Sequence, residues 1–275
     1  MNFIFKYSQH IIFLLTFLVR ITLWIVFFNN VEIGPDSKEY LGVGKNLVDG
    51  LGLWNNERGG EYYFSEPIYP LLIAFLKLFF NNIKIIIIAQ SIISSLSSIL
   101  FFKIMLDLHF SKKVSFIATI ILILHPYINY WNVLYMPESL RVFALLLMIK
   151  FVLKLLKKMT TKDVIYFGLI SGFASLVRFP FGFMIPFFAM YLFIFIKIYN
   201  IKNLFIYLFA SLLVLSPWYI RNYSINGSIS KYSILERFSD GLKPETIYRI
   251  TDKDKYYKEM GGNRKVMRDD VIDHE

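Results

Sequence analysis

The chain has 275 residues, 56% of them hydrophobic, and carries 30 Lys and Arg against 20 Asp and Glu. This composition excludes a disordered chain, which requires low hydrophobicity. It also argues against a single soluble globule, because several windows of about 18–20 residues hold almost no charge. The absence of Cys excludes a disulfide framework, a thiol nucleophile and a Cys-ligated metal site.

The net charge of +10 lies mainly in residues 1–220, which hold 19 basic and 10 acidic residues. Most of these basic residues fall in short connections between apolar segments. That distribution is typical of the positive-inside rule for membrane proteins. We therefore expect a bilayer, and no nucleic acid, among the partners of this chain.

Eight apolar segments follow one another along the chain. They are residues 11–28, 67–80, 85–106, 114–131, 139–156, 164–177, 181–196 and 203–218. The first has no small-residue cleavage site after it, so it is interpreted as a retained span and not as a signal peptide. The second is the exception in length: a helix of its fourteen residues would be ~21 Å long, against a hydrocarbon core of ~30 Å.

The positions of the lysines decide how segment 67–80 is interpreted. If the N-terminus is cytoplasmic and this segment does not cross, Lys112, Lys113 and the cluster 154–162 all face the cytoplasm. If it crosses, that cluster faces outward, against the rule. We therefore predict an all-α polytopic membrane protein with about seven spans and a re-entrant or interfacial helix at 67–80.

This topology predicts two regions. Residues 1–220 form a transmembrane module whose outer loop, 29–66, holds seven acidic residues and three basic ones. Residues 221–275 form a polar tail outside the cytoplasm. Because the chain stops in this charged tail, we expect either a fragment or a shortened protein.

Three carboxylates in the outward-facing part are candidates for chemistry. Asp36, just after the first span, could accept a proton from a hydroxyl, or cap a helix in a capping box with Glu39. Glu66, before Pro67, could lie beside a phosphate-bound cation or complement a helix dipole. Glu138, after Pro137, could be a capping residue or a functional acid at the edge of a span.

Two arginines fall at the same predicted face. Arg178 lies between two apolar segments, and Arg221 follows Trp218 and Tyr219. Each could be a snorkelling surface side chain or a phosphate clamp, since a guanidinium donates to two phosphate oxygens at once.

Five short motifs in order resemble those of the GT-C glycosyltransferases over about residues 10–230. They are Asp36-x-x-x-Tyr40 with Leu47-x-x-Gly50-x-Gly52, Glu66-Pro67-Ile68-Tyr69-Pro70, Met136-Pro137-Glu138-Ser139-Leu140, Leu176-Val177-Arg178-Phe179-Pro180, and Pro217-Trp218-x-x-Arg221-Asn222-Tyr223. The branch that they resemble most is that of the dolichyl-phosphate-mannose–protein mannosyltransferases and the bacterial aminoarabinose transferase of lipid A. Two departures are the short chain and Pro67, where some members have a phosphate-binding Lys.

The resemblance implies an inverting membrane glycosyltransferase that uses a polyprenyl-phosphate sugar and a lipid, glycan or protein acceptor. Asp36 is implied as the catalytic carboxylate, and Tyr40, Glu66, Glu138, Arg178 and Arg221 as binding residues. The leaving phosphate would be neutralised by arginine or by a divalent metal ion, for which Glu66 and Glu138 are the candidate ligands. The implied location is the cytoplasmic membrane, with the active site facing outward.

Two alternatives stay open from the sequence. One is a transporter or flippase for a lipid-linked or anionic solute, which would need ionisable residues at mid-membrane depth and often shows internal repeats. The other is an inactive, truncated relative. The residues do not identify the sugar, the carrier or the acceptor.

Overall fold

The computed structural model describes residues 7–28, 33–55, 61–62, 66–178, 180–194 and 201–227. Its helices are α2 (Ser8–Leu23), the π-helix η1 (Trp24–Phe28), α3 (Pro35–Val48), α4 (Ile68–Phe79), α5 (Ile85–Asp107), α6 (Lys112–Leu124), α7 (Pro126–Asn132), α8 (Glu138–Lys157), α9 (Thr161–Val177), α10 (Pro180–Ile194) and α11 (Ile201–Asn226). Two-residue strands β1 (Trp54–Asn55) and β2 (Glu61–Tyr62) pair antiparallel. Apart from this pair, the expectation of an all-helical chain is confirmed.

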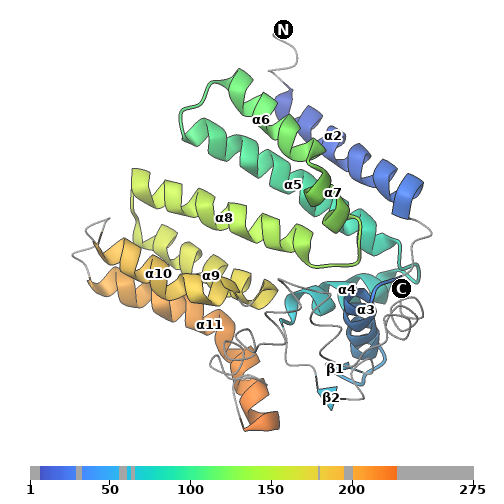
Figure 1. Cartoon of the computed structure of the whole chain (residues 1–275). Coiled ribbons are helices and arrows are strands. Elements are labelled where there is room, and N and C mark those ends of the chain that lie inside the picture. Colours follow the sequence, from blue (N-terminus) through green and yellow to red (C-terminus); the bar gives the residue numbers. More distant parts are fainter. Residues whose placement is uncertain are drawn as a thin grey trace, which may run out of the picture.

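The helices form a layered bundle with a small group of elements at one end (Figure 1). The long helices lie side by side, whereas α3, α4 and the two strands lie together beyond the ends of several of them. α4 packs against α3 and also touches α5 and α9. The short apolar segment 67–80 is therefore a helix that closes one end of the bundle, as its length suggests.

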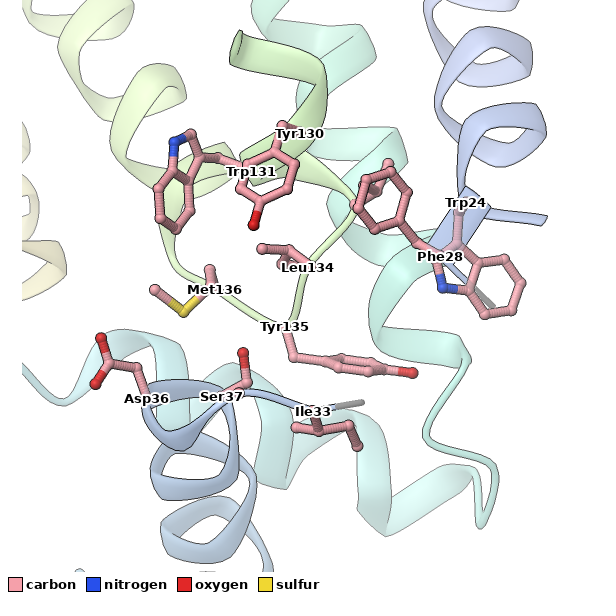
Figure 2. Close-up of a pocket in the computed structure, with 12 residues that line it drawn as sticks. Trp24, Phe28, Ile33, Asp36, Ser37, Tyr130, Trp131, Leu134, Tyr135 and Met136 are labelled. Atoms are coloured by element: carbon pink, nitrogen blue, oxygen red, sulfur yellow. The ribbon is translucent and has the colours of Figure 1, made fainter. Parts of the chain in front are cut away.

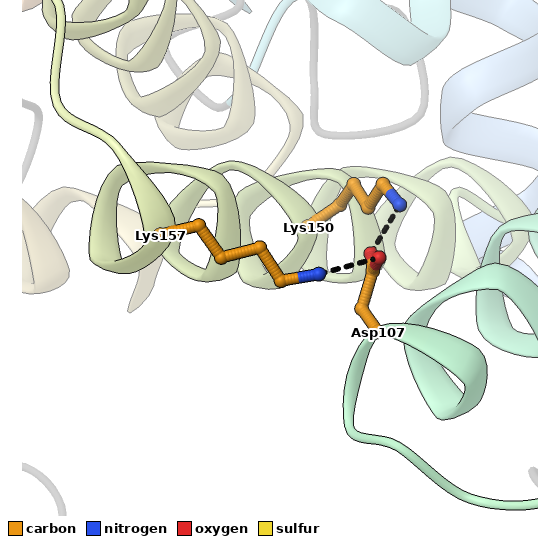
Figure 3. Close-up of polar contacts among 3 residues, drawn as sticks. All are labelled: Asp107, Lys150 and Lys157. Atoms are coloured by element: carbon orange, nitrogen blue, oxygen red, sulfur yellow. Dashed lines mark hydrogen bonds and ion pairs between the residues drawn. The ribbon is translucent and has the colours of Figure 1, made fainter.

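Two sets of contacts show that α5 and α8 point in the same direction. Near their N-terminal ends, the Gln90 amide of α5 donates to the backbone oxygen of Met136, just before α8. Near their C-terminal ends, Asp107 forms ion pairs with Lys150 and Lys157 (Figure 3). The chain therefore passes through the bundle in alternating directions, and helix α3 lies at the end where α8 begins.

The ends of the helices follow local sequence signals. Ser111 caps α6 by accepting a hydrogen bond from the backbone N–H of Val114, and Thr160 caps α9 in the same way from Asp163. The apolar segment 114–131 is not one continuous helix, because α6 ends at Leu124, with His125 and Pro126 following, and α7 continues at an angle of 56°. The residue before a proline is disfavoured in helical conformation, which explains the break.

Several helices are long and apolar enough to cross a membrane. In the part of the chain that the structure describes there are three, Ser8–Phe28, Ile85–Asp107 and Ile201–Ile225, and α6 with α7 would make a fourth. α9 and α10 are short, with 17 and 15 residues. A polytopic helical membrane architecture agrees with these helices, whereas the number of seven spans stays a prediction. α11 continues to Asn226, past the expected boundary at residue 220, and the tail 228–275 lies outside the described residues.

Candidate active site

Helix α3 carries two of the predicted site residues, Asp36 and Tyr40. Gly34 is the N-cap residue and Pro35 follows at the start of the helix, a position where proline is favoured. Asp36 therefore lies inside the first turn and is not the N-cap residue. The capping-box alternative for Asp36 is wrong for this reason. Asp36 is exposed and lies one turn before Tyr40, so both residues are on one face of α3.

Arg178 joins helix α9 to this face of α3. It follows the last residue of α9, and its Nη1 donates a hydrogen bond of 3.2 Å to the Tyr40 hydroxyl. The Tyr40 ring meets the ring of Tyr69 in α4 edge-on, with 5.2 Å between centroids. Burial raises the pKa of Tyr40 to about 12, although Arg178 opposes this shift. The hydroxyl therefore stays protonated and accepts the guanidinium N–H as a neutral group.

Glu138 places a half-buried carboxylate beside the same arginine. It is the first residue of α8, outside the predicted span 139–156, and its side chain is 18% exposed. Burial raises the pKa of Glu138, and the negative charge of Asp36 adds to this, while Arg178 and Arg141 oppose it. One carboxylate oxygen, Oε2, is buried and has no hydrogen-bond partner among the residues that the structure describes. Such an oxygen is an acceptor held ready for a ligand or a water molecule.

Arg178 is the centre of this group of charges. Burial acts to lower its pKa, but Tyr40, Glu66 and Glu138 outweigh burial, and the pKa is raised above the ordinary arginine value. Glu66 lies just before Pro67, the N-cap residue of α4, and its charge also acts on Tyr40. The structure thus brings Asp36, Tyr40, Glu66, Glu138 and Arg178, which the family resemblance implied as residues of one site, into one group that we call the charged cluster.

Arg221 is held by other contacts at the same end of the bundle. Its guanidinium stacks on the ring of Trp218, 4.9 Å from the centroid, and donates to the side-chain oxygen of Asn222 at 2.8 Å. A further N–H reaches the backbone oxygen of Leu53, between α3 and β1, at 3.4 Å. The Arg221 side chain therefore connects α11 to the loop after α3. These contacts differ from the hydrogen bond that Arg178 makes to Tyr40.

Metal binding by Glu66 and Glu138 stays a prediction. Among the residues that the structure describes, no three His, Cys, Asp or Glu side chains are grouped closely enough to hold an ion. A divalent cation can also be held by one or two carboxylates together with phosphate and water oxygens. Glu66 and Glu138 would therefore hold an ion only together with such oxygens.

An aromatic pocket of about 250 Å³ opens beside Asp36 (Figure 2). Asp36 and Ser37, in the first turn of α3, form one edge of it, facing the loop between α7 and α8. Its aromatic members come from the end of the first span, from α7 and from that loop: Trp24, Phe28, Tyr130, Trp131 and Tyr135. The Tyr130 and Trp131 rings are 5.2 Å apart, and Phe28 lies 5.7 Å from Tyr130. We call this cavity the aromatic pocket.

Comparison with protein families decides what kind of chain this is. Residues 66–220, more than half of the sequence, match the family model described as dolichyl-phosphate-mannose-protein mannosyltransferase. The chain belongs to this mannosyltransferase family. Its members are membrane glycosyltransferases of the GT-C kind, in agreement with the resemblance of the motifs. No curated protein and no solved structure matches the sequence.

The matched segment contains only part of the charged cluster. Glu66, Glu138 and Arg178 lie within residues 66–220, whereas Asp36, Tyr40 and Arg221 lie outside. The assignment of the mannosyltransferase family therefore rests on helices α4 to α11. Asp36 and Tyr40 are linked to that segment by the fold, through the bond between Tyr40 and Arg178.

Gln90, a residue that the sequence did not single out, holds the loop before Glu138 in place. Gln90 is fully buried in α5, and its amide donates to the backbone oxygens of Leu134 and Met136 at 3.0 and 2.8 Å. Its side-chain oxygen accepts from the Tyr69 hydroxyl at 3.3 Å. A buried amide is costly unless its donors and acceptor are paired, and its position within an apolar segment is the signal that could have drawn attention to it.

Arg20, a residue that the sequence did not single out, is buried inside the first apolar helix. The side chain is 3% exposed, and within the described part of the chain its Nε and Nη1 find no hydrogen-bond partner. It borders a small cavity of about 20 Å³ together with Ser94 and Asn132. This mannosyltransferase-family chain therefore has a buried charge inside an apolar helix, which is a feature that the transporter alternative requires. A buried ionisable residue in a membrane helix is typical of functional sites.

Proposed function

We propose that this chain transfers a sugar from a polyprenyl-phosphate donor to an acceptor hydroxyl at the charged cluster. The observation that carries the proposal is the surroundings of Arg178: one half-buried guanidinium bonded to Tyr40, with Glu66 and Glu138 close enough to act on it. Asp36 is exposed, and its negative charge acts on Glu138. Membership of a mannosyltransferase family supports the reaction class.

The proposed reaction is a single displacement at the anomeric carbon of the donor. The acceptor oxygen forms a new bond to that carbon while the bond from the carbon to the phosphate oxygen breaks. The electron pair of the broken bond leaves on the phosphate, and the hydroxyl proton goes to the Asp36 carboxylate. Attack from the side opposite the phosphate inverts the anomeric configuration. General-base help of this kind typically contributes ~10²–10⁴-fold to the rate.

Arg178 is the proposed phosphate-binding residue. A guanidinium has five N–H donors in a planar fork, and only the bond to the Tyr40 hydroxyl occupies one of them in the described part of the chain. The remaining donors suit two oxygens of a phosphate group. A cation at this place stabilises the charge that develops on the leaving phosphate. Arg221 at the same end of the bundle is a second candidate for this role.

The proposed position of the reaction is the outer face of the cytoplasmic membrane. The end of the bundle that holds the charged cluster has fewer lysines than the opposite end: Lys38, Lys45, Lys77 and Lys84 lie in α3, in α4 and just before α5. The opposite end holds Lys150 and Lys157 with Asp107, and Lys154 with Asp163. A basic end is expected to face the cytoplasm. A lipid-linked donor fits a site at the membrane surface, because the bilayer concentrates and orients it there.

The test of this proposal is the substitution Asp36→Asn. The amide keeps the size of the side chain but cannot act as a base, so sugar transfer should fall by ~10²–10⁴-fold. The measurement is transfer of label from a panel of radiolabelled polyprenyl-phosphate sugars in membranes, with the amount of protein checked by immunoblot.

Asp49→Asn is the matched control for this test. Asp49 ends the same helix α3, is exposed, and undergoes the same chemical change. We expect it to transfer sugar at the unmutated rate. Near-normal transfer by Asp36→Asn would show that Asp36 is not the general base. An absence of transfer by the unmutated chain with every donor tested would refute the proposed function.

A further inference from the structure

We infer that the aromatic pocket binds a sugar ring of the acceptor, so that the acceptor is a carbohydrate. This inference rests on the proposed function and specifies one of its substrates. It starts from the position of Asp36, which belongs both to the rim of the pocket and to the groups that act on Glu138.

The position of Asp36 assigns the pocket to the acceptor. In a displacement with inversion, the attacking oxygen and the leaving phosphate lie on opposite sides of the anomeric carbon. The residues that line the pocket do not include Arg178, the proposed phosphate-binding residue. The proposed base must lie within reach of the attacking hydroxyl. Asp36 belongs to the edge of the aromatic pocket (Figure 2), so a ring held there has its hydroxyl groups beside Asp36.

The lining of the pocket suits a sugar ring. A pyranose has apolar C–H faces and a rim of hydroxyl groups, so it pairs with aromatic faces and with a few polar side chains. The rings of Trp131 and Tyr130 provide such faces, as does Phe28, and Asp36 and Ser37 provide polar groups at one edge. A volume of about 250 Å³ is below the roughly 300–1,000 Å³ of sites for drug-sized ligands, and it suits one ring.

A peptide acceptor fits this lining less well. It would bring backbone N–H and C=O groups, each of which requires a hydrogen-bond partner when buried. The backbone oxygens of Leu134 and Met136, on the loop that lines the pocket, already accept from the Gln90 amide. An isoprenoid chain fits less well for another reason, because it is far longer than the pocket and leaves the polar edge at Asp36 without a partner.

Ligand-detected NMR on the full-length protein in nanodiscs tests the inference without requiring turnover. The probes are methyl α-mannopyranoside, methyl β-glucopyranoside and methyl β-galactopyranoside, with an N-acetylated threonine peptide amide and farnesol as the two alternatives. We expect saturation transfer from aromatic protein protons to the ring protons of at least one glycoside. Trp131→Ala should weaken that binding by about tenfold or more, because it removes a ring face.

The control is Tyr166→Ala, an exposed aromatic residue on α9 that is not part of the pocket. Glycoside binding by this variant should equal that of the unmutated chain. Binding that Trp131→Ala leaves unchanged would overturn the inference. The absence of any glycoside signal would also overturn it. A signal from the peptide or from farnesol alone that Trp131→Ala reduces would overturn it as well, because the pocket would then bind a different class of acceptor.

The two proposals can fail separately. A chain that binds a glycoside through Trp131 but transfers no sugar would refute the proposed function and leave the sugar site standing. A chain that transfers sugar to a peptide or a non-carbohydrate lipid, and shows no glycoside signal, would refute this inference and leave the transferase activity standing.

Discussion

Glu138 shows how one side chain combines a structural cost with a functional position. The carboxylate is brought into a half-buried environment by the first turn of α8, where negative charge is favourable for the helix. Burial nevertheless disfavours the charged form, and in the described part of the chain the buried Oε2 has no hydrogen-bond partner. The buried position of the Glu138 carboxylate therefore suits the binding of a ligand and does not stabilise the folded chain.

The pH dependence of stability tests this interpretation of Glu138. Since its pKa is raised in the folded protein, the protonated side chain stabilises the fold below the ordinary glutamate pKa. This stability is lost as the pH rises through the raised value. Glu138→Gln removes the titration, so the variant should unfold at a higher temperature than the unmutated chain at pH 8. The two melting temperatures should converge at about pH 4, near the ordinary glutamate pKa.

The measurement is thermal unfolding of the purified protein in detergent between pH 4 and pH 8, followed by tryptophan fluorescence. Asp49→Asn provides the same loss of one carboxylate at an exposed position. A lower melting temperature for Glu138→Gln at pH 8 would contradict the prediction, because it would mean that the charged carboxylate stabilises the fold through Arg178 and Arg141.

At the scale of elements, the close approach of α9 and α11 holds Arg178 in place. A Cβ atom at Gly168 would lie 2.6 Å from the backbone oxygen of Tyr207, and one at Gly172 would lie 2.7 Å from that of Ser211. Small residues four apart allow two membrane helices to pack with their backbones in near contact. The Ser211 hydroxyl then donates to the backbone oxygen of Gly168 at 3.1 Å. Arg178 ends α9, so this packing positions the charged cluster.

Replacing each of two glycines with alanine distinguishes the effect of helix packing on stability from the effect of helix propensity. Gly168→Ala should destabilise the protein by ~1–3 kcal/mol through overpacking against α11. Gly182→Ala on α10 is the control, because its Cβ would meet nothing closer than 3.9 Å. Alanine favours a helix over glycine by ~1 kcal/mol, so this control should unfold at an equal or higher temperature. The measurement is thermal unfolding in detergent, and equal effects at both positions would contradict the close packing of α9 and α11.

At the scale of the whole molecule, the two ends of the bundle differ in charge and should face opposite sides of the membrane. Leu51, after α3, and Asn82, after α4, are exposed at the end that holds the charged cluster. Ser111, before α6, is exposed at the opposite end. If α4 does not cross the bilayer, the first two positions share the outer side.

Single cysteines test this topology directly, since the chain has none of its own. Leu51→Cys and Asn82→Cys should react with an impermeant thiol reagent in intact cells. Ser111→Cys should react only after the membrane is permeabilised, which serves as the control for its accessibility. Labelling of Ser111→Cys in intact cells would reverse the predicted orientation. Opposite labelling of the positions 51 and 82 would show that α4 spans the membrane.

The sequence by itself determined most of the apolar helices and the ends at which the polar residues lie. Apolar segments and prolines are local properties, so they predicted α4 as a separate short helix and a span from residue 139, one residue after the start of α8 at Glu138. The lysine distribution predicted that Glu138 and Arg178 lie at one end of the bundle and Asp107 at the other. The contacts between helix ends agree with this, because short connections between membrane helices leave few other arrangements.

Only the tertiary structure decided which of these residues act together and what surrounds them. Tyr40 and Arg178 are 138 positions apart in the chain and share a hydrogen bond. The sequence does not show which face of each helix packs against a neighbouring helix, because an apolar side chain can face either lipid or protein. For the same reason the roles of Gln90, Arg20 and the aromatic pocket escaped sequence reasoning. The rotation of each helix about its axis, fixed by packing, brings these distant side chains to one place.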